Sequence, residues 1–194
     1  MTFWQDATIE PKRAYRFLLS VSGRNTTIKN FLIKKVNKPS FTVSESEHKY
    51  LNHTFYYPGK VTWNEVTFTI VDVVDSTDDA TATVMKVFSG EPNSLGDTGM
   101  GYQLPTTSDV TSTISKAKSV QALGNVIIRQ IDADGRNVDA WKLNNAWIKD
   151  VKFGELDYNS EELLNVDVTL RYDNAIFQNN QGKFPGNSIS QDLL

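Results

Sequence analysis

Residues 145–174 read NAWIKDVKFGELDYNSEELLNVDVTLRYDN, with a run of apolar-alternating residues on each side of a polar patch at 157–162. In the second run the apolar positions are Val166, Val168, Leu170 and Tyr172. A period of two over this length predicts a strand with one buried face, because successive side chains of a strand point to opposite faces. The first run carries Trp147, Val151 and Phe153. Because the two runs are close in sequence, they predict neighbouring antiparallel strands of one sheet.

The composition fits a single β-rich domain over residues 1–194. The chain is 39% hydrophobic and 11% aromatic, which is enough to build a core, and aromatic side chains suit half-buried pleated surfaces. A net charge of −3 provides no overall basic field for gripping nucleic acid. The absence of cysteine excludes disulfides, thiolate catalysis and cysteine-based zinc sites.

The sequence carries no signal for export or for membrane insertion. Residues 1–13 have no cationic region followed by an apolar run, so they do not resemble a secretory signal. No segment approaches the roughly 18 apolar residues that a membrane-spanning helix needs. We therefore expect a soluble protein that is made and used without export.

Turn signals divide much of the remaining chain into further strands. These strands are predicted at 14–21, 28–36, 63–74, 121–131 and 138–147. The first two are expected to pair as a hairpin, and the last two flank an Asp-Gly hairpin turn at 132–136. The triplet at 58–60, Pro-Gly-Lys, is predicted as a turn because proline presets φ and glycine accepts positive φ.

One short helix is predicted over residues 80–88. Asp75 or Ser76 would be its N-cap, Asp78 and Asp79 would lie in its first turn, and Gly90 would end it. Three segments lack a strand or helix pattern: an N-terminal arm at 1–13, a long loop at 91–115 and a flexible C-terminal tail at 179–194.

Residues 41–57 allow two interpretations. The segment is long and carries charges that a buried strand would not tolerate, among them Glu45, Glu47 and Lys49. It could form a long β-arm that projects from the sheet with both faces partly exposed to water. Alternatively, it could be an irregular loop followed by a short strand at 53–57.

The candidates for metal binding are weak. His48 and His53 are the only histidines, and their odd spacing puts them on opposite faces of a strand, where they cannot bind one ion. Asp132-Ala-Asp134-Gly135 resembles the start of a calcium loop, but Leu143 stands where the bidentate glutamate is required. A tight hairpin explains the Asp-Gly pair better.

The candidates for catalysis are equally weak. Residues 96–101 have the glycine spacing of a phosphate loop, but Tyr102 and Gln103 replace the residues that would bind phosphate and magnesium. The carboxylate pairs Asp78/Asp79 and Glu161/Glu162 lie where helix-start and turn chemistry explain them, and no nucleophile elbow is present. We expect no enzyme activity and no cofactor.

Several aromatic residues lie near lysine or arginine, as in sheets that bind single-stranded nucleic acid. These are Tyr15, Phe17, Tyr56, Trp63 and Phe68. Their period-two neighbours suggest that they pack in the core instead, and the negative net charge is wrong for nucleic-acid binding.

Two segments resemble the tail tube proteins of contractile-tail bacteriophages. A tryptophan-bearing strand runs into KDVKFGELDY at 149–158 and, after an acidic turn, into VTLRYDNA at 168–175. Upstream, residues 55–72 read FYYPGKVTWNEVTFTIVD and resemble the block of that family in which YYPG precedes a tryptophan, an alternating strand and an aspartate. The two segments occur in the order found in the family.

The resemblance implies an antiparallel β-sandwich or barrel-like tube fold with one short flanking α-helix. It implies homohexameric rings that stack as the inner tube of a contractile tail, a conduit for DNA ejection. The implied partners are further copies of the chain, the tail sheath protein, the baseplate hub and tail terminator proteins, and the tape measure protein in the lumen. DNA would pass through the lumen without specific binding. The expected location is the virion tail, and the host cytoplasm during assembly.

The resemblance also suggests which residues serve assembly. Lumen-facing side chains must not bind phosphate, so Glu45, Glu47 and Asp167 are the lumen candidates. Candidates for contacts between rings or between subunits are Lys49, Tyr56, Tyr57 and Lys60. Such contacts are expected from the N-terminal arm, from segment 37–60 and from the loop before the helix, whereas segment 91–115 is longer than the family pattern.

Two alternatives remain. The chain could be a baseplate or tail-end protein that initiates or caps the tube, since these proteins share the fold. From a different class, it could be a β-sandwich binding module with a flat row of exposed aromatics. In that case Trp141 and Trp147 would bind the ligand, whereas in a tube protein their loss would damage folding or assembly.

Overall fold

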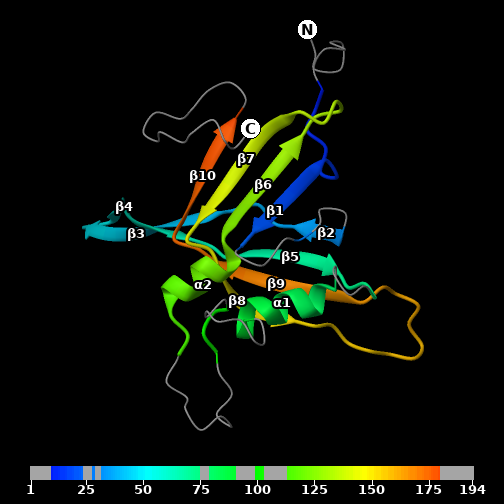
Figure 1. The fold of residues 1–194 in the computed structure, drawn as a ribbon. Coiled ribbons are helices and arrows are strands. Elements are labelled where there is room, and N and C mark those ends of the chain that lie inside the picture. The colour runs from blue at the N-terminus through cyan, green and yellow to red at the C-terminus, as the bar shows by residue number, and fades with distance from the viewer. Residues whose placement is uncertain are drawn as a thin grey trace.

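The computed structural model describes residues 10–23, 28, 32–74, 79–90, 99–102 and 113–179. These residues form a mainly β protein with two four-stranded antiparallel sheets, a separate two-stranded hairpin and two helices (Figure 1). The first sheet has the strand order β1 (Phe17–Ser22), β6 (Asn125–Ile131), β7 (Asn137–Asn144), β10 (Asn174–Asn179). The second has the order β2 (Ile33–Val36), β5 (Val66–Val71), β9 (Asn165–Arg171), β8 (Trp147–Lys152).

The centre of the second sheet confirms the strand pair predicted from residues 145–174. β8 and β9 pair antiparallel, with Ile148 opposite Leu170. β9 also pairs with β5, and Phe68 lies opposite Val168. The inward side chains of β5 and β9 are almost completely buried and form the middle of the core. The alternation in the sequence therefore reflects a sheet with one face on the core and one polar face.

The predicted hairpin between residues 14–21 and 28–36 is wrong. β1 pairs with β6, placing Leu19 opposite Ile128, whereas β2 pairs with β5 in the other sheet. Both strands are edge strands, one in each sheet. Crossing from one sheet to the other lets both strands bury an apolar face in the same core.

The single predicted helix is present as α1 (Ala80–Ser89), and it buries Ala80, Val84 and Val87. Its N-cap is Asp79, not Asp75 or Ser76, because the Asp79 carboxylate accepts a hydrogen bond from the N–H of Ala82 at 2.7 Å. Gly90 ends the helix as predicted.

A second helix, α2 (Lys116–Leu123), corrects the prediction of one helix. Its residues KAKSVQAL carry little apolar periodicity, and the buried ones are Ser119, Ala122 and Leu123. The hydroxyl of Ser115 caps its start, and Gly124 ends it at a φ of 73°. The strand predicted from 121 consequently begins only at Asn125.

The hairpin turn at 132–136 is confirmed, since the N–H of Asp132 donates to the carbonyl of Arg136 at 3.0 Å. The strand predicted at 138–147 is two strands, because Asn145 adopts a left-handed φ of 54° between β7 and β8. β10, which pairs with β7, was not predicted, and its last residue, Asn179, was assigned to the tail.

Much of the predicted arm, loop and tail lies outside the described residues, namely 1–9, 91–98, 103–112 and 180–194. The described end of the N-terminal arm, 10–13, is exposed, and Lys12 forms an ion pair with Asp139 of β7. Among the described helices, none has the length and apolar character needed to cross a membrane.

Candidate assembly surfaces

Residues 41–63 form a two-stranded arm, and this decides between the two interpretations of the segment. β3 (Phe41–Tyr50) and β4 (His53–Trp63) pair antiparallel with each other, not with either sheet. Nearly every residue of the arm is exposed. Figure 1 shows it projecting from one side of the molecule.

The turn predicted at Pro58-Gly59-Lys60 is wrong, because these residues lie inside β4. The chain reverses instead at residues 51–52, where Leu51 has a φ of 50°. The pairing of β3 with β4 is irregular at Gly59 and Lys60. On one side of them Val43 pairs with Val61, and on the other Glu45 pairs with Pro58. There the N–H of Lys60 donates to the hydroxyl of Ser44 at 2.8 Å. A Cβ on residue 59 would lie 2.4 Å from that oxygen, so a larger residue there would push the Ser44 hydroxyl aside.

The arm is unusually apolar for a segment exposed on both faces. Its exposed large apolar side chains are Phe41, Val43, Tyr50, Leu51, Phe55, Tyr56, Tyr57 and Val61. Several large exposed apolar side chains gathered on one projecting element are typical of interaction sites in soluble proteins. In addition, the outer edges of the arm carry backbone groups that no strand of the described chain pairs. The arm can therefore offer both apolar surface and hydrogen-bonding edges to another chain.

The root of the arm is anchored to the core. The ring of Trp63 packs 5.4 Å from that of Phe41 and 6.0 Å from that of Tyr172. The N–H of Asn64 donates to the carbonyl of Ser40 at 2.8 Å. Burial at this root raises the pKa of the Tyr172 phenol. The arm thus starts from a fixed base.

The structure brings six of the seven predicted assembly residues together on the arm. These are Glu45, Glu47, Lys49, Tyr56, Tyr57 and Lys60. All are exposed, and Lys49 lies 3.6 Å from the carboxylate of Glu47. Asp167 is elsewhere, on the exposed face of β9, where it accepts a hydrogen bond from Thr69 at 2.6 Å.

The five aromatic residues predicted to pack in the core divide into two groups. Phe68 is buried, and Phe17 and Trp63 are half-buried against the core. The prediction is wrong for Tyr15 and Tyr56, which are 72% and 61% exposed. Both lie outside the two-sheet core, on the segment before β1 and on the arm.

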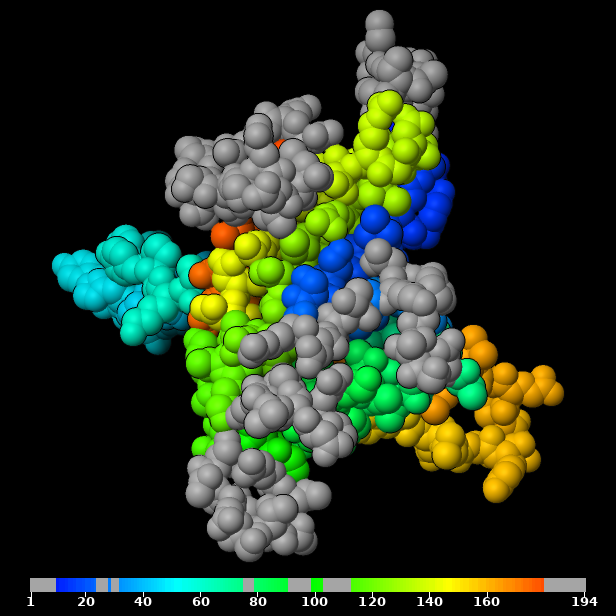
Figure 2. Space-filling view, viewed as in Figure 1, coloured from blue at the N-terminus to red at the C-terminus, as the bar shows by residue number. Residues whose placement is uncertain are grey.

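The sequence pattern predicts only a turn at residues 157–162, but these residues belong to a second projecting surface. Between β8 and β9, residues 153–164 form a loop that is exposed along nearly its whole length. We call residues 153–164 the acidic loop. Figure 2 shows it projecting on the opposite side of the molecule from the arm.

The other candidates do not form a site. Within the residues that the structure describes, no three potential metal ligands gather around one point. His53 packs edge-on against Phe55, with ring centroids 4.6 Å apart. Trp141 packs 4.8 Å from Phe177, and both Trp141 and Trp147 lie against the core. These two tryptophans are therefore packing residues rather than a flat exposed row.

The junction between α2 and the strands is held by a charged contact. Both oxygens of the Asp173 carboxylate accept hydrogen bonds from the Lys116 ammonium group at 2.7 Å, and Asn145 donates a third at 2.8 Å. These hydrogen bonds lower the pKa of Asp173, and the bond from Lys116 has the largest effect. They fix the first residue of α2 to the turn between β9 and β10.

No protein-family model matches the sequence, and no curated protein matches it. Solved structures with a similar fold come from contractile injection systems. A chain of the anti-feeding prophage baseplate superposes with a TM-score of 0.59 at 15% identity, covering 89% of this chain and 99% of that one.

Two further similar chains come from an extracellular contractile injection system called PVC. One belongs to its sheath/tube terminator, with a TM-score of 0.60, 17% identity and coverage of 89% and 99%. The other belongs to its sheath–tube complex, with a TM-score of 0.58, 18% identity and coverage of 92% and 99%. With two antiparallel sheets, a projecting arm and these structural neighbours, the chain has the tail-tube fold of contractile systems.

Proposed function

We propose that this protein is a structural component that assembles into hexameric rings, stacked as the inner tube of a contractile tail and serving as a conduit for DNA ejection. The observation that carries the proposal is the β3–β4 arm on a tail-tube fold. It combines exposed apolar side chains with open strand edges, which are a liability in a monomer and useful in an assembly. No step in this role requires an enzyme.

In the assembled state, the arm would contact a neighbouring subunit or ring through Lys49, Tyr56, Tyr57 and Lys60. Glu45, Glu47 and Asp167 would face the lumen, where carboxylates repel the phosphates of DNA and keep it from binding. A sheath protein would surround the tube, a baseplate hub and a terminator would close its ends, and a tape measure protein would occupy the lumen. The assembled protein would reside in the virion tail after forming in the host cytoplasm.

A second candidate within the same fold is a baseplate or tail-end protein that initiates or caps a tube. It is favoured by the similarity to chains from a baseplate and from a sheath/tube terminator. Such a protein would need a template and would not form long tubes alone.

The test is negative-stain electron microscopy of the purified chain, with sedimentation velocity on the same sample. Rings of six subunits or hollow tubes of uniform diameter are the expected result. A matched variant replaces residues 44–60 with a short glycine–serine turn, which leaves both sheets intact, and it should remain a folded monomer. Single rings that stack only when baseplate components are added would favour the tail-end candidate. A wild-type chain that stays monomeric under all these conditions would contradict self-assembly.

The lumen assignment has its own test. Replacing Glu45, Glu47 and Asp167 together with lysine should make assembled particles retain duplex DNA in a salt-dependent manner. The control variant is Asp134→Lys, which reverses the charge of an exposed carboxylate in the β6–β7 turn. Equal DNA retention by both variants would contradict a lumen position for the three carboxylates.

A further inference from the structure

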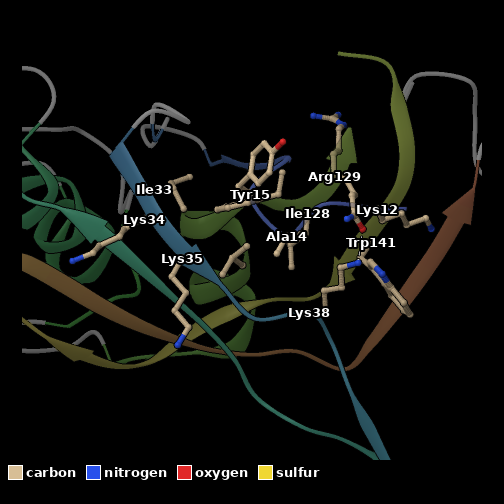
Figure 3. Close-up of a pocket in the computed structure, with 13 residues that line it drawn as sticks. Lys12, Ala14, Tyr15, Ile33, Lys34, Lys35, Lys38, Ile128, Arg129 and Trp141 are labelled. Carbon is tan, nitrogen blue, oxygen red and sulfur yellow. Dashed lines mark hydrogen bonds between the residues drawn. The ribbon is translucent and has the colours of Figure 1, made fainter. Parts of the chain in front are cut away.

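A hollow opens between the edge strands of the two sheets. It has a volume of about 900 Å³ and lies where β1 and β6 of the first sheet face β2 of the second (Figure 3). Its apolar lining includes Phe17, Ile33, Val36, Ile128 and Trp141. These side chains belong to the core or pack against it, so the hollow gives a partner access to the apolar interior.

Cations surround this apolar hollow. The charged residues that line it are Lys12, Lys34, Lys35, Lys38 and Arg129, and no carboxylate is among the lining residues that the structure describes. Figure 3 shows Lys34 and Lys35 projecting outward from β2 on one side and Lys12 and Arg129 on the other. We call this feature the cationic hollow.

Some of these cations already have partners and some do not. Lys12 pairs with Asp139, and Lys38 donates to the side-chain carbonyl of Gln130 at 2.6 Å. Arg129 donates from Nη1 to Ser20 at 2.9 Å, but its buried Nε finds no acceptor in the described part of the chain. Lys34 and Lys35 form no side-chain hydrogen bond or ion pair with any described residue. The hollow therefore retains unused positive charge.

The acidic loop has the complementary composition. Residues 153–164 read FGELDYNSEELL, with four carboxylates and no cation. Three of its apolar side chains, Leu156, Tyr158 and Leu163, are 69% exposed or more. Its tip is ordered by its own hydrogen bonds, since Asp157 accepts from the N–H of Asn159 at 3.0 Å and Ser160 accepts from that of Glu162 at 3.3 Å. The loop thus presents an acidic and apolar surface to solvent. Figure 2 shows it projecting from the molecule.

We propose that the acidic loop of one copy docks into the cationic hollow of a second copy. Its exposed Leu156 and Tyr158 side chains would enter the hollow, while Glu161 and Glu162 would pair with Lys34 and Lys35 at the rim. Such a contact joins two different surfaces of the same chain head to tail, which is the type of contact that builds rings and filaments. Complementary charge would select the register and speed association. The proposal rests on the proposed self-assembly and names two of the surfaces that meet.

The chain has no cysteine, so engineered thiols allow a direct test. One copy carries Ala14→Cys at the exposed edge of the hollow, and a second, mass-tagged copy carries Tyr158→Cys. The two are mixed and treated with a short bis-maleimide cross-linker. The matched control replaces Ala14→Cys with Ala117→Cys, another exposed alanine, on α2. We expect at least about tenfold more mixed dimer with Ala14→Cys than with the control.

Charge reversal tests the pairing itself. Introducing Lys34→Glu and Lys35→Glu into the Ala14→Cys copy should lower the yield of mixed dimer about tenfold, because like charges would then oppose docking. Introducing Glu161→Lys and Glu162→Lys into the Tyr158→Cys copy should likewise lower the yield of mixed dimer about tenfold. Combining the two reversed copies should restore the yield. Damage to either fold would not be repaired by this combination.

The outcomes separate this inference from the proposed function. Assembled particles without a cross-link above the control would overturn the docking while leaving tube assembly intact. A specific, charge-rescued cross-link in a chain that never forms rings or tubes would support the docking and overturn the proposed function. Loss of salt-dependent DNA binding in Lys34→Glu/Lys35→Glu, with no cross-link between copies, would assign the cations to phosphate and overturn the docking.

Discussion

The carboxylate of Asp72 accepts a 2.7 Å hydrogen bond from the hydroxyl of Thr81 and so joins the end of β5 to the first turn of α1. The same carboxylate accepts hydrogen bonds from the N–H groups of Ala80 at 3.0 Å and of Thr81 at 3.3 Å. Burial acts to raise the pKa of Asp72, but these hydrogen bonds outweigh it and lower the pKa below its usual value. One side chain thus holds α1 against the second sheet.

Replacing Asp72 with alanine should destabilise the protein by about 1–2 kcal/mol, because it leaves helix N–H groups without their acceptor. The free energy of unfolding should be measured by urea denaturation at neutral pH. Asp134→Ala, at an exposed position in the β6–β7 turn, is the control and should change it by less than about 0.5 kcal/mol. Equal effects of the two substitutions would show that Asp72 does not hold the helix.

The contribution of Asp72 should depend on pH in a defined direction. Because its pKa is lower in the folded state than in the unfolded state, the contribution is complete well above the ordinary carboxyl value of about 3.9. It is lost as the pH falls through the lowered folded-state pKa. The stability difference between wild type and Asp72→Asn should therefore shrink between about pH 5 and pH 2. A difference that stays constant over that range would contradict a lowered pKa.

Two glycines with similar positive φ angles should respond very differently to alanine. Gly124, between α2 and β6, has a φ of 73°, and a Cβ there would lie 2.0 Å from the carbonyl oxygen of Ser22. Gly135, in the β6–β7 turn, has a φ of 79°, but a Cβ would meet nothing within 4 Å. Gly135→Ala should destabilise by about 1–2 kcal/mol from backbone strain alone.

Gly124→Ala should lower the free energy of unfolding by clearly more than Gly135→Ala does. In addition to the strain of the positive φ, the backbone of residues 22–23 would have to move away from the new Cβ. The comparison is made by chemical denaturation of the two variants side by side. Similar values for both would mean that the contact between residues 22–23 and Gly124 relaxes at little cost.

The arm should matter for assembly and not for folding. Tyr56→Ser and Tyr57→Ser remove exposed rings, so each should change the free energy of unfolding by less than about 0.5 kcal/mol. In sedimentation velocity, both should reduce self-assembly. Phe68→Ala, in the core strand β5, is the opposite case and should destabilise by about 3–5 kcal/mol. Normal assembly by both tyrosine variants would show that Tyr56 and Tyr57 do not lie in the interface.

Features visible in the sequence were those set by local pattern. The alternation in residues 166–172 identified β9, and the Asp-Gly turn identified the β6–β7 hairpin, since both follow from the chain's own geometry. The same reasoning missed α2, whose few buried residues give a weak helical signal, and it took Pro58-Gly59-Lys60 for a turn. Proline and glycine also fit an exposed irregularity within a long hairpin. Local pattern cannot distinguish such an irregularity from a turn.

By itself, the sequence determined that the protein is mainly β, that residues 145–174 hold a strand pair and that no catalytic or metal motif is complete. Only the tertiary structure decided which strands pair, because β1–β6 and β2–β5 contacts join residues far apart in the chain. It also decided that 41–63 leaves the sheets as an arm, and that lysines from 12 to 38 gather with Arg129 around one hollow. The physical reason is that a strand's period reports which face is buried, whereas its partner depends on non-local packing that no local stretch encodes.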